Sequence, residues 1–94
     1  MANIQSAIKR IRQSEKARKR NRVYRSRART YIKRTNAYLE QERLQEAQEA
    51  AMLAVSALDR AVSRGVIHKN NAARRKSRLM AKLNQAKAAA TAAE

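Results

Sequence analysis

The residue types that support catalysis or metal binding are scarce in this sequence. It contains a single histidine, His68, and no cysteine, glycine-rich phosphate loop or paired-carboxylate motif. One imidazole and scattered acids also lack the spacing of a metal site, and a histidine at this position is better suited to cap a helix or contact a phosphate. We therefore expect a protein that is not an enzyme and that uses no cofactor, metal or small-molecule substrate.

Basic side chains, by contrast, are abundant and regularly spaced. The 23 Lys and Arg residues against 7 Asp and Glu give a net charge of +16, which predicts a polyanionic partner. Five of them recur at steps of three or four residues: Arg18, Arg22, Arg25, Arg29 and Lys33. On a helix they form one cationic stripe, and their mutual repulsion favours a bound nucleic acid over a merely solvated face. The excess of arginine over lysine favours bidentate phosphate recognition.

The elements that carry these side chains are expected to be helices, since residues that end helices are nearly absent. There is no proline, and Gly65 is the only glycine. Alanine supplies much of the apolar content, so the chain can bury only a thin core. We expect an all-α fold: a single domain over residues 1–94 that forms a three-helix bundle with a long, protruding basic first helix.

Apolar residues recur at helical spacing in three segments. The first stripe is Tyr24, Ala28, Tyr31, Thr35 and Tyr38. The second is Leu44, Ala47, Ala51, Ala54, Val55, Leu58 and Val62, and the third is Ala72, Leu79, Leu83, Ala86 and Ala90. They predict helices over residues 4–39, 43–63 and 70–87, followed by a frayed tail over residues 88–94.

The two expected turns differ in how clearly the sequence marks them. The second stripe is rotated by roughly 240° from the first, which predicts a chain reversal near residues 40–43. No glycine or proline marks that reversal, so one continuous long helix remains an alternative. The second turn is predicted at Gly65, a residue suited to the left-handed position after a helix, with Asn70 or Asn71 capping the third helix.

Two sets of apolar side chains raise the question of what they contact. Ile4, Ile8 and Ile11 project roughly opposite the tyrosine stripe on a straight helix. We therefore expect the N-terminal part of the first helix to extend beyond the bundle and insert into the partner. The three tyrosines could stack on bases, but their heptad spacing favours packing in the core.

The distribution of charge along the chain favours nucleic acid over a membrane. Residues 1–34 and 64–87 are strongly basic, whereas residues 35–63 have a small acidic excess, so the middle helix is expected to lie between two basic helices. There is no apolar run near 18 residues, and Ala17 is the only apolar residue between Arg12 and Arg22, too little to bury in a membrane surface. A DNA-coating protein remains the main alternative to an RNA-binding one.

Several short motifs in the two basic blocks occur together in one known family. They are Ala2-Asn3-Ile4-Gln5-Ser6-Ala7, Lys9-Arg10, Gln13-Ser14-Glu15-Lys16, Arg25-Ser26, Arg29-Thr30, Gly65-Val66-Ile67-His68-Lys69-Asn70, Ala72-Ala73-Arg74 and Lys76-Ser77. With these motifs the chain resembles the bacterial small-subunit ribosomal protein twenty family over nearly its whole length. Members of that family often have a glycine in the first turn, which is absent here.

The resemblance implies a cytoplasmic three-helix bundle that binds 16S ribosomal RNA directly in the small subunit, early in assembly and near the bottom of its body. Other small-subunit components are further candidate partners. It also implies RNA contacts between Lys9 and Arg34 and between His68 and Arg78. Within these ranges the candidate RNA-binding residues are Lys9, Arg10, Arg12, Lys16, Arg18, Lys19, Arg20, Arg22, Arg25, Arg29, Lys33, His68, Lys69, Asn70, Arg74, Arg75, Lys76 and Arg78.

Overall fold

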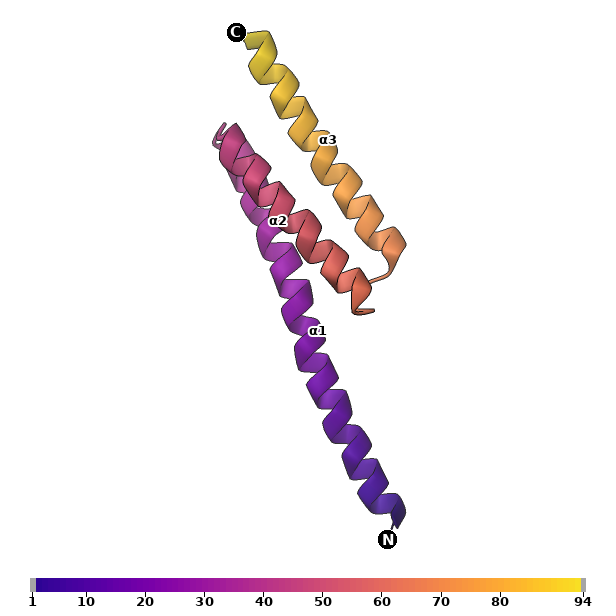
Figure 1. Cartoon of the computed structure of the whole chain (residues 1–94). Helices are drawn as coiled ribbons and strands as arrows, with labels where there is room; N and C mark the ends of the chain where they lie inside the picture. Colours follow the sequence, from indigo (N-terminus) through magenta and orange to yellow (C-terminus); the bar gives the residue numbers. More distant parts are fainter. Residues whose placement is uncertain (1, 94) are drawn as a thin grey trace.

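The computed structural model describes residues 2–93, which form three α-helices and no strand (Figure 1). The helices are α1 (Ala2–Glu40), α2 (Leu44–Ser63) and α3 (Lys69–Ala93). The predicted all-α class and the long first helix are confirmed. At about 1.5 Å per residue, the 39 residues of α1 extend roughly twice as far as the 20 residues of α2.

The helices are arranged in sequence order, with α2 in the middle. α2 runs back along the C-terminal half of α1, and α3 packs on the other side of α2 (Figure 1). α1 and α3 touch each other only slightly. The described chain is therefore elongated, with extents of 74 × 22 × 14 Å, and α2 holds the two basic helices side by side.

The core is thin and built largely of alanine, as the composition predicts. One cluster joins Ala47, Ala51 and Ala54 of α2 to Leu79 and Leu83 of α3, with Tyr31 and Tyr38 packed against it. This packing confirms the expected core role of these two tyrosines. Small side chains let the helices approach closely, and the few buried methyl groups limit the stabilisation that burial provides.

A second cluster lies nearer the second turn and completes the core. It consists of Ala28, Ala57, Leu58 and Ala72.

Thr35 is buried within the tyrosine stripe of α1, where its hydroxyl donates a hydrogen bond to the Tyr31 carbonyl at 2.8 Å. That bond satisfies a polar group that would otherwise be costly to bury.

The first turn occupies residues 41–43, so the alternative of one continuous helix is wrong. The Glu42 N–H donates to the Leu39 carbonyl and the Arg43 N–H to the Tyr38 carbonyl. This pair of bonds is the Schellman arrangement, which requires a left-handed residue at its centre. Glu42 takes that position with φ of 60°, although glycine is the residue that adopts it without steric cost.

The second turn has the same arrangement with the expected residue. Gly65 has φ of 72°, its N–H donates to the Val62 carbonyl, and the Val66 N–H donates to the Ala61 carbonyl. Val66 is buried directly after the turn. The prediction of a left-handed glycine at the end of the second helix is confirmed.

Both ends of α3 differ from the sequence-based expectation. The helix begins at Lys69 rather than at residue 70, and its cap is neither Asn70 nor Asn71: the Nδ1 atom of His68 accepts a hydrogen bond from the Asn70 N–H at 3.1 Å. At the other end, α3 continues through the residues expected to fray and reaches Ala93. Alanine has the highest helix propensity, which favours this extension, and Ala86, Ala89 and Ala90 line a small pocket with Leu39 and Leu44. Glu94 lies outside the described residues.

Candidate nucleic-acid interface

The N-terminal part of α1 extends well beyond the other two helices (Figure 1). Every side chain from residue 3 to residue 16 is exposed. Ile4, Ile8 and Ile11 are 62%, 45% and 58% exposed, so they do not join the core. The expected extension of α1 beyond the bundle is confirmed. This overhang, residues 3–16, exposes both isoleucine and basic side chains.

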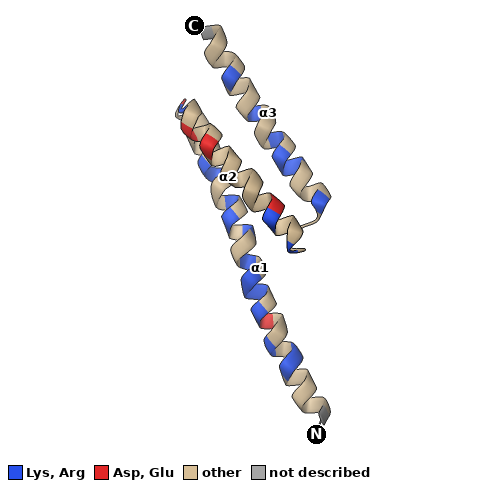
Figure 2. Ribbon diagram, in the orientation of Figure 1, with Lys and Arg blue, Asp and Glu red and all other residues tan. Residues whose placement is uncertain are grey.

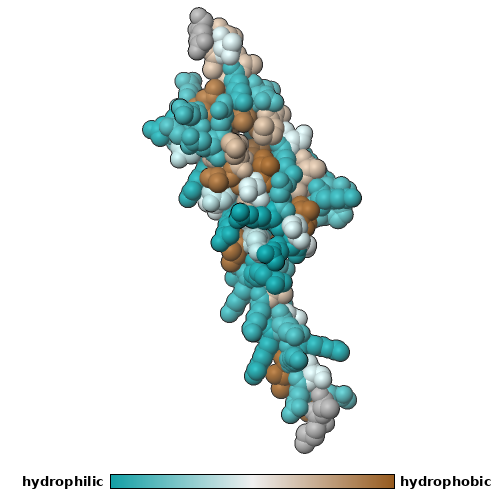
Figure 3. Space-filling view, in the orientation of Figure 1, coloured by the Kyte–Doolittle hydropathy of each residue, from teal (hydrophilic) through white to brown (hydrophobic). Residues whose placement is uncertain are grey.

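Charge and hydropathy differ between the overhang and the bundle. Basic residues follow α1 and α3, whereas most acids lie on α2 and in the turn before it (Figure 2). On the face shown in Figure 3, the surface of the overhang is mainly hydrophilic, with a small hydrophobic patch toward its end. The acidic block therefore lies between two basic helices, as the charge pattern predicts.

The predicted cationic stripe forms one continuous face of α1. Arg18, Arg22, Arg25 and Arg29 line a shallow polar groove along the helix, together with Ser14, Ala17, Asn21 and Ser26. Tyr24 and Tyr31 face the other way, toward Leu53 and Ala57 of α2. Arg18, Arg22 and Arg29 are exposed on this face, whereas Arg25 also contacts the second turn through the Val66 carbonyl.

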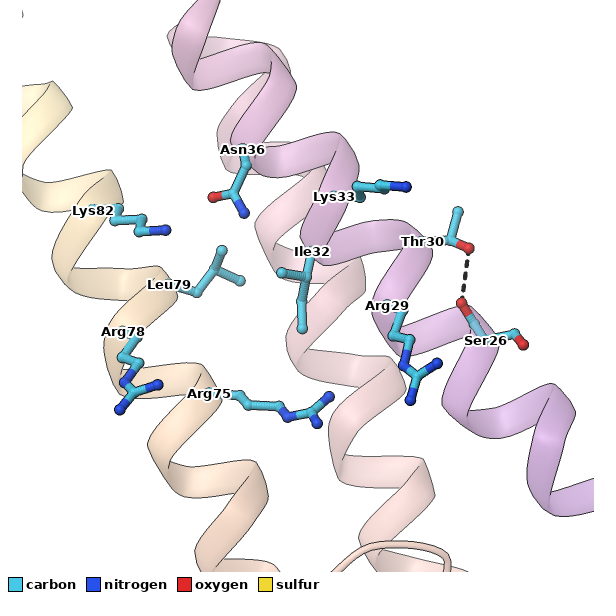
Figure 4. A pocket seen from close by; sticks show the side chains of 10 residues that line it. All are labelled: Ser26, Arg29, Thr30, Ile32, Lys33, Asn36, Arg75, Arg78, Leu79 and Lys82. Atoms are coloured by element: carbon cyan, nitrogen blue, oxygen red, sulfur yellow. Dashed lines mark hydrogen bonds between the residues drawn. The ribbon is translucent and has the colours of Figure 1, made fainter.

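A second groove opens where the stripe meets α3 (Figure 4). It is open to solvent and has a volume of about 620 Å³ between the two helices. It is lined by Ser26, Arg29, Thr30, Ile32, Lys33 and Asn36 of α1 and by Arg75, Arg78, Leu79 and Lys82 of α3. Five of these side chains are basic and none is acidic, so the groove combines a strong positive charge with the apolar side chains of Ile32 and Leu79.

Specific contacts hold the two walls of this groove in place. The Arg25 guanidinium donates to the Val66 carbonyl at 3.3 Å, which ties α1 to the second turn. Lys76 pairs with Asp59 and links α3 to α2. On α3, the Arg75 Nε atom donates to Asn71 Oδ1 at 2.9 Å, which limits the conformations of that guanidinium.

The structure brings some candidate residues together and leaves others apart. Arg29, Lys33, Arg75 and Arg78 share the groove between α1 and α3, and His68 lies nearby, in a smaller pocket that also contains Arg25, Arg29 and Arg75. The remaining candidates on α1 are exposed on the overhang or along the stripe: Lys9, Arg10, Arg12, Lys16, Arg18, Lys19, Arg20 and Arg22. Lys69, Asn70 and Arg74 are exposed in the first turns of α3.

Two groove residues were missed by the sequence reasoning. Lys82 lies one helical turn after Arg78 and Leu79, and this spacing could have identified it as part of the same face. Asn36 is half-buried and its amide points into the groove (Figure 4). No sequence signal marks Asn36, because its role depends on the position of α3.

Other classes of site find no support in residues 2–93. No group of three His, Cys, Asp or Glu residues in this part of the chain is arranged to hold a metal ion. None of the three helices as described is both long and apolar enough to cross a membrane.

Comparison with known proteins identifies the family of the chain. A family model described as "Ribosomal protein S20" matches residues 2–84. The chain is 51% identical over 88 residues to the small ribosomal subunit protein bS20 of Geobacillus thermodenitrificans, covering 94% of this chain and 99% of that protein. It is 45% identical over 85 residues to the bS20 protein of Dictyoglomus thermophilum, covering 90% of this chain and 91% of that protein.

Proposed function

Because this chain belongs to the ribosomal protein S20 family, we propose that it is a structural constituent of the small ribosomal subunit that binds 16S ribosomal RNA directly. In this function it catalyses no reaction. It works in the cytoplasm as part of a ribonucleoprotein that carries out translation, in contact with RNA and with neighbouring subunit components.

The observation that carries this proposal is the basic surface formed by α1 and α3. The stripe on α1 leads into the groove between the helices, and the residues that line the groove include five cations and no acid. Such a surface matches the phosphate backbone of a folded RNA, which supplies the counter-charge that the protein lacks. None of the residues that line the two grooves is aromatic, so recognition rests mainly on phosphate contacts and shape and not on stacking of bases against aromatic rings.

The overhang extends this recognition beyond the bundle. A single helix is narrow enough to lie between RNA helices, with Lys9, Arg10 and Arg12 directed at phosphates. Ile4 and Ile8 would then contact sugar or base faces, which gives these exposed apolar side chains a partner. In this arrangement the protein stabilises the RNA fold by linking segments that are separate in the RNA secondary structure.

Nucleotide-resolution footprinting on isolated 16S ribosomal RNA tests the proposal. We expect localised protection at nanomolar protein that an equal mass of duplex DNA does not compete away at matched salt. Protection spread evenly over the RNA, or efficient competition by DNA, would instead favour a DNA-coating or non-specific polyanion-binding protein.

A pair of charge-matched variants connects the footprint to the interface. Arg78→Ala removes one cation from the groove, whereas Arg60→Ala removes one from the exposed surface of α2. We expect Arg78→Ala to weaken RNA binding several-fold and Arg60→Ala to leave it nearly unchanged, because of these two arginines only Arg78 faces a phosphate in the proposed complex. Equal losses from both variants would argue for attraction by net charge alone.

A further inference from the structure

In the groove between α1 and α3, the edge of the hydrophobic core lies next to basic side chains. Phosphate needs only cations and N–H donors, yet the groove contains the apolar side chains of Ile32 and Leu79 (Figure 4). Leu79 is 3% exposed, so it lies at the bottom rather than on the rim. An apolar floor under a basic rim is suited to a ligand with a flat apolar face and an attached negative charge.

The size of the groove limits what can enter it. Its volume of about 620 Å³, although open to solvent, is comparable with that of sites for small organic ligands. An RNA duplex is too wide to enter the groove between α1 and α3, but a single unpaired nucleotide is narrow enough. From this fit of volume, floor and charge we propose that the groove receives one unpaired nucleotide of the bound RNA, with its base inside and its phosphates at the rim.

Named side chains give each part of such a nucleotide a contact. The base face lies on Ile32 and Leu79, and the Asn36 amide, which points into the groove, can donate to and accept from a base edge. Arg75 and Lys82 extend from α3 toward α1 (Figure 4), in position for the flanking phosphates. Among the side chains drawn in Figure 4, the hydrogen bond marked is the one that Thr30 donates to the Ser26 carbonyl. It does not involve the Asn36 amide, which can therefore pair with a base edge.

This inference rests on the proposed function and deepens it, because a protein that binds only the outside of RNA helices would leave the groove empty. Three synthetic RNAs separate the two cases: a fully paired hairpin, the same hairpin with one bulged nucleotide, and that hairpin with an abasic residue at the bulge. The abasic RNA keeps the flexibility and phosphates of the bulge and lacks only the base.

We expect the full-length protein to bind the base-bearing bulge about tenfold more tightly than either other RNA, because only that RNA offers a base to the groove. Asn36→Leu is expected to reduce that preference by roughly fivefold, because leucine cannot form a hydrogen bond with a base edge. Asn84→Leu, the same substitution at an exposed position of α3 outside the groove, should retain the full preference.

Equal affinity for the base-bearing and abasic bulges would overturn the proposal while leaving RNA binding intact. The same conclusion would follow if Asn36→Leu and Asn84→Leu behaved alike. Failure to bind any of the three RNAs would overturn the proposed function itself, and this inference with it.

Discussion

At the scale of single residues, Glu42 is the position where the sequence fits its backbone least well. It adopts φ of 60° in the first turn, a conformation that costs a side-chain-bearing residue about 1–2 kcal/mol relative to glycine. Gly65 occupies the equivalent place in the second turn at φ of 72°, where an added Cβ atom would meet nothing within 4 Å. The strain at such a position therefore comes from the backbone and not from crowding.

We predict that Glu42→Gly raises the free energy of unfolding by about 1 kcal/mol, because glycine removes this strain. Chemical denaturation followed by circular dichroism measures the change. Glu42→Gln is the matched control, since it removes the same charge and keeps a Cβ atom. A glycine variant no more stable than the glutamine variant would show that the turn is not strained at this residue.

His68 offers a second residue-scale prediction, because its side chain caps α3. His68→Ala should lower the free energy of unfolding by about 1 kcal/mol, and His68→Asn should restore most of it, since asparagine is also a good N-cap. Thermal melts of the three proteins measure the difference. Identical melting temperatures would mean that the Nδ1 hydrogen bond contributes nothing to stability.

At the scale of elements, the overhang of α1 differs from the rest of the fold. Residues 3–16 are exposed throughout, and an isolated helix of this length is marginally stable in water. We predict rapid amide hydrogen exchange there in the free protein, slow exchange in α2, and protection of the overhang when RNA is bound. Mass spectrometry of the exchanged protein gives the comparison. Strong protection of residues 4–20 without RNA would contradict an overhang that becomes ordered on its partner.

The three helices could be predicted because apolar residues recur every three or four positions along each buried helix face. The stripe through Ala28 and Thr35 and the one through Ala51 and Leu58 both identify buried residues. The change of phase between them located the first turn even though no glycine marks it. The helix ends were less predictable, because they depend on local propensity rather than on periodicity. The sequence favours His68 as a helix cap or phosphate contact but also offers Asn70 and Asn71 as caps of α3, and the alanine-rich end of that helix was expected to fray.

The groove could be predicted only in part. The spacing of Arg29 and Lys33 predicts that they share one face of α1, and the basic residues after Gly65 predict that the start of α3 is basic. Which face of α3 turns toward α1 depends on how Leu79 and Leu83 pack against the alanines of α2, and a single sequence does not give that rotation. For this reason Asn36 was identified only from the structure, whereas the spacing from Arg78 to Lys82 already places Lys82 on the same face of α3.

At the scale of the whole molecule, shape and charge act together. The chain has a net charge of +16 and extents of 74 × 22 × 14 Å, and its largest fully buried side chains are Leu58 and Thr35. Repulsion between the basic helices opposes compaction, and a small core offsets little of it. In the proposed complex, a folded RNA supplies the counter-charge for this basic surface.

The salt dependence of RNA binding tests this central claim most directly. If about eight phosphates are neutralised along α1 and in the groove, a plot of log K against log salt concentration should have a slope of roughly −6 to −7. Filter binding or fluorescence anisotropy with 16S ribosomal RNA, over a series of salt concentrations, measures it. A slope in that range would support binding through a long phosphate-contacting surface, whereas a slope near −2 would contradict it.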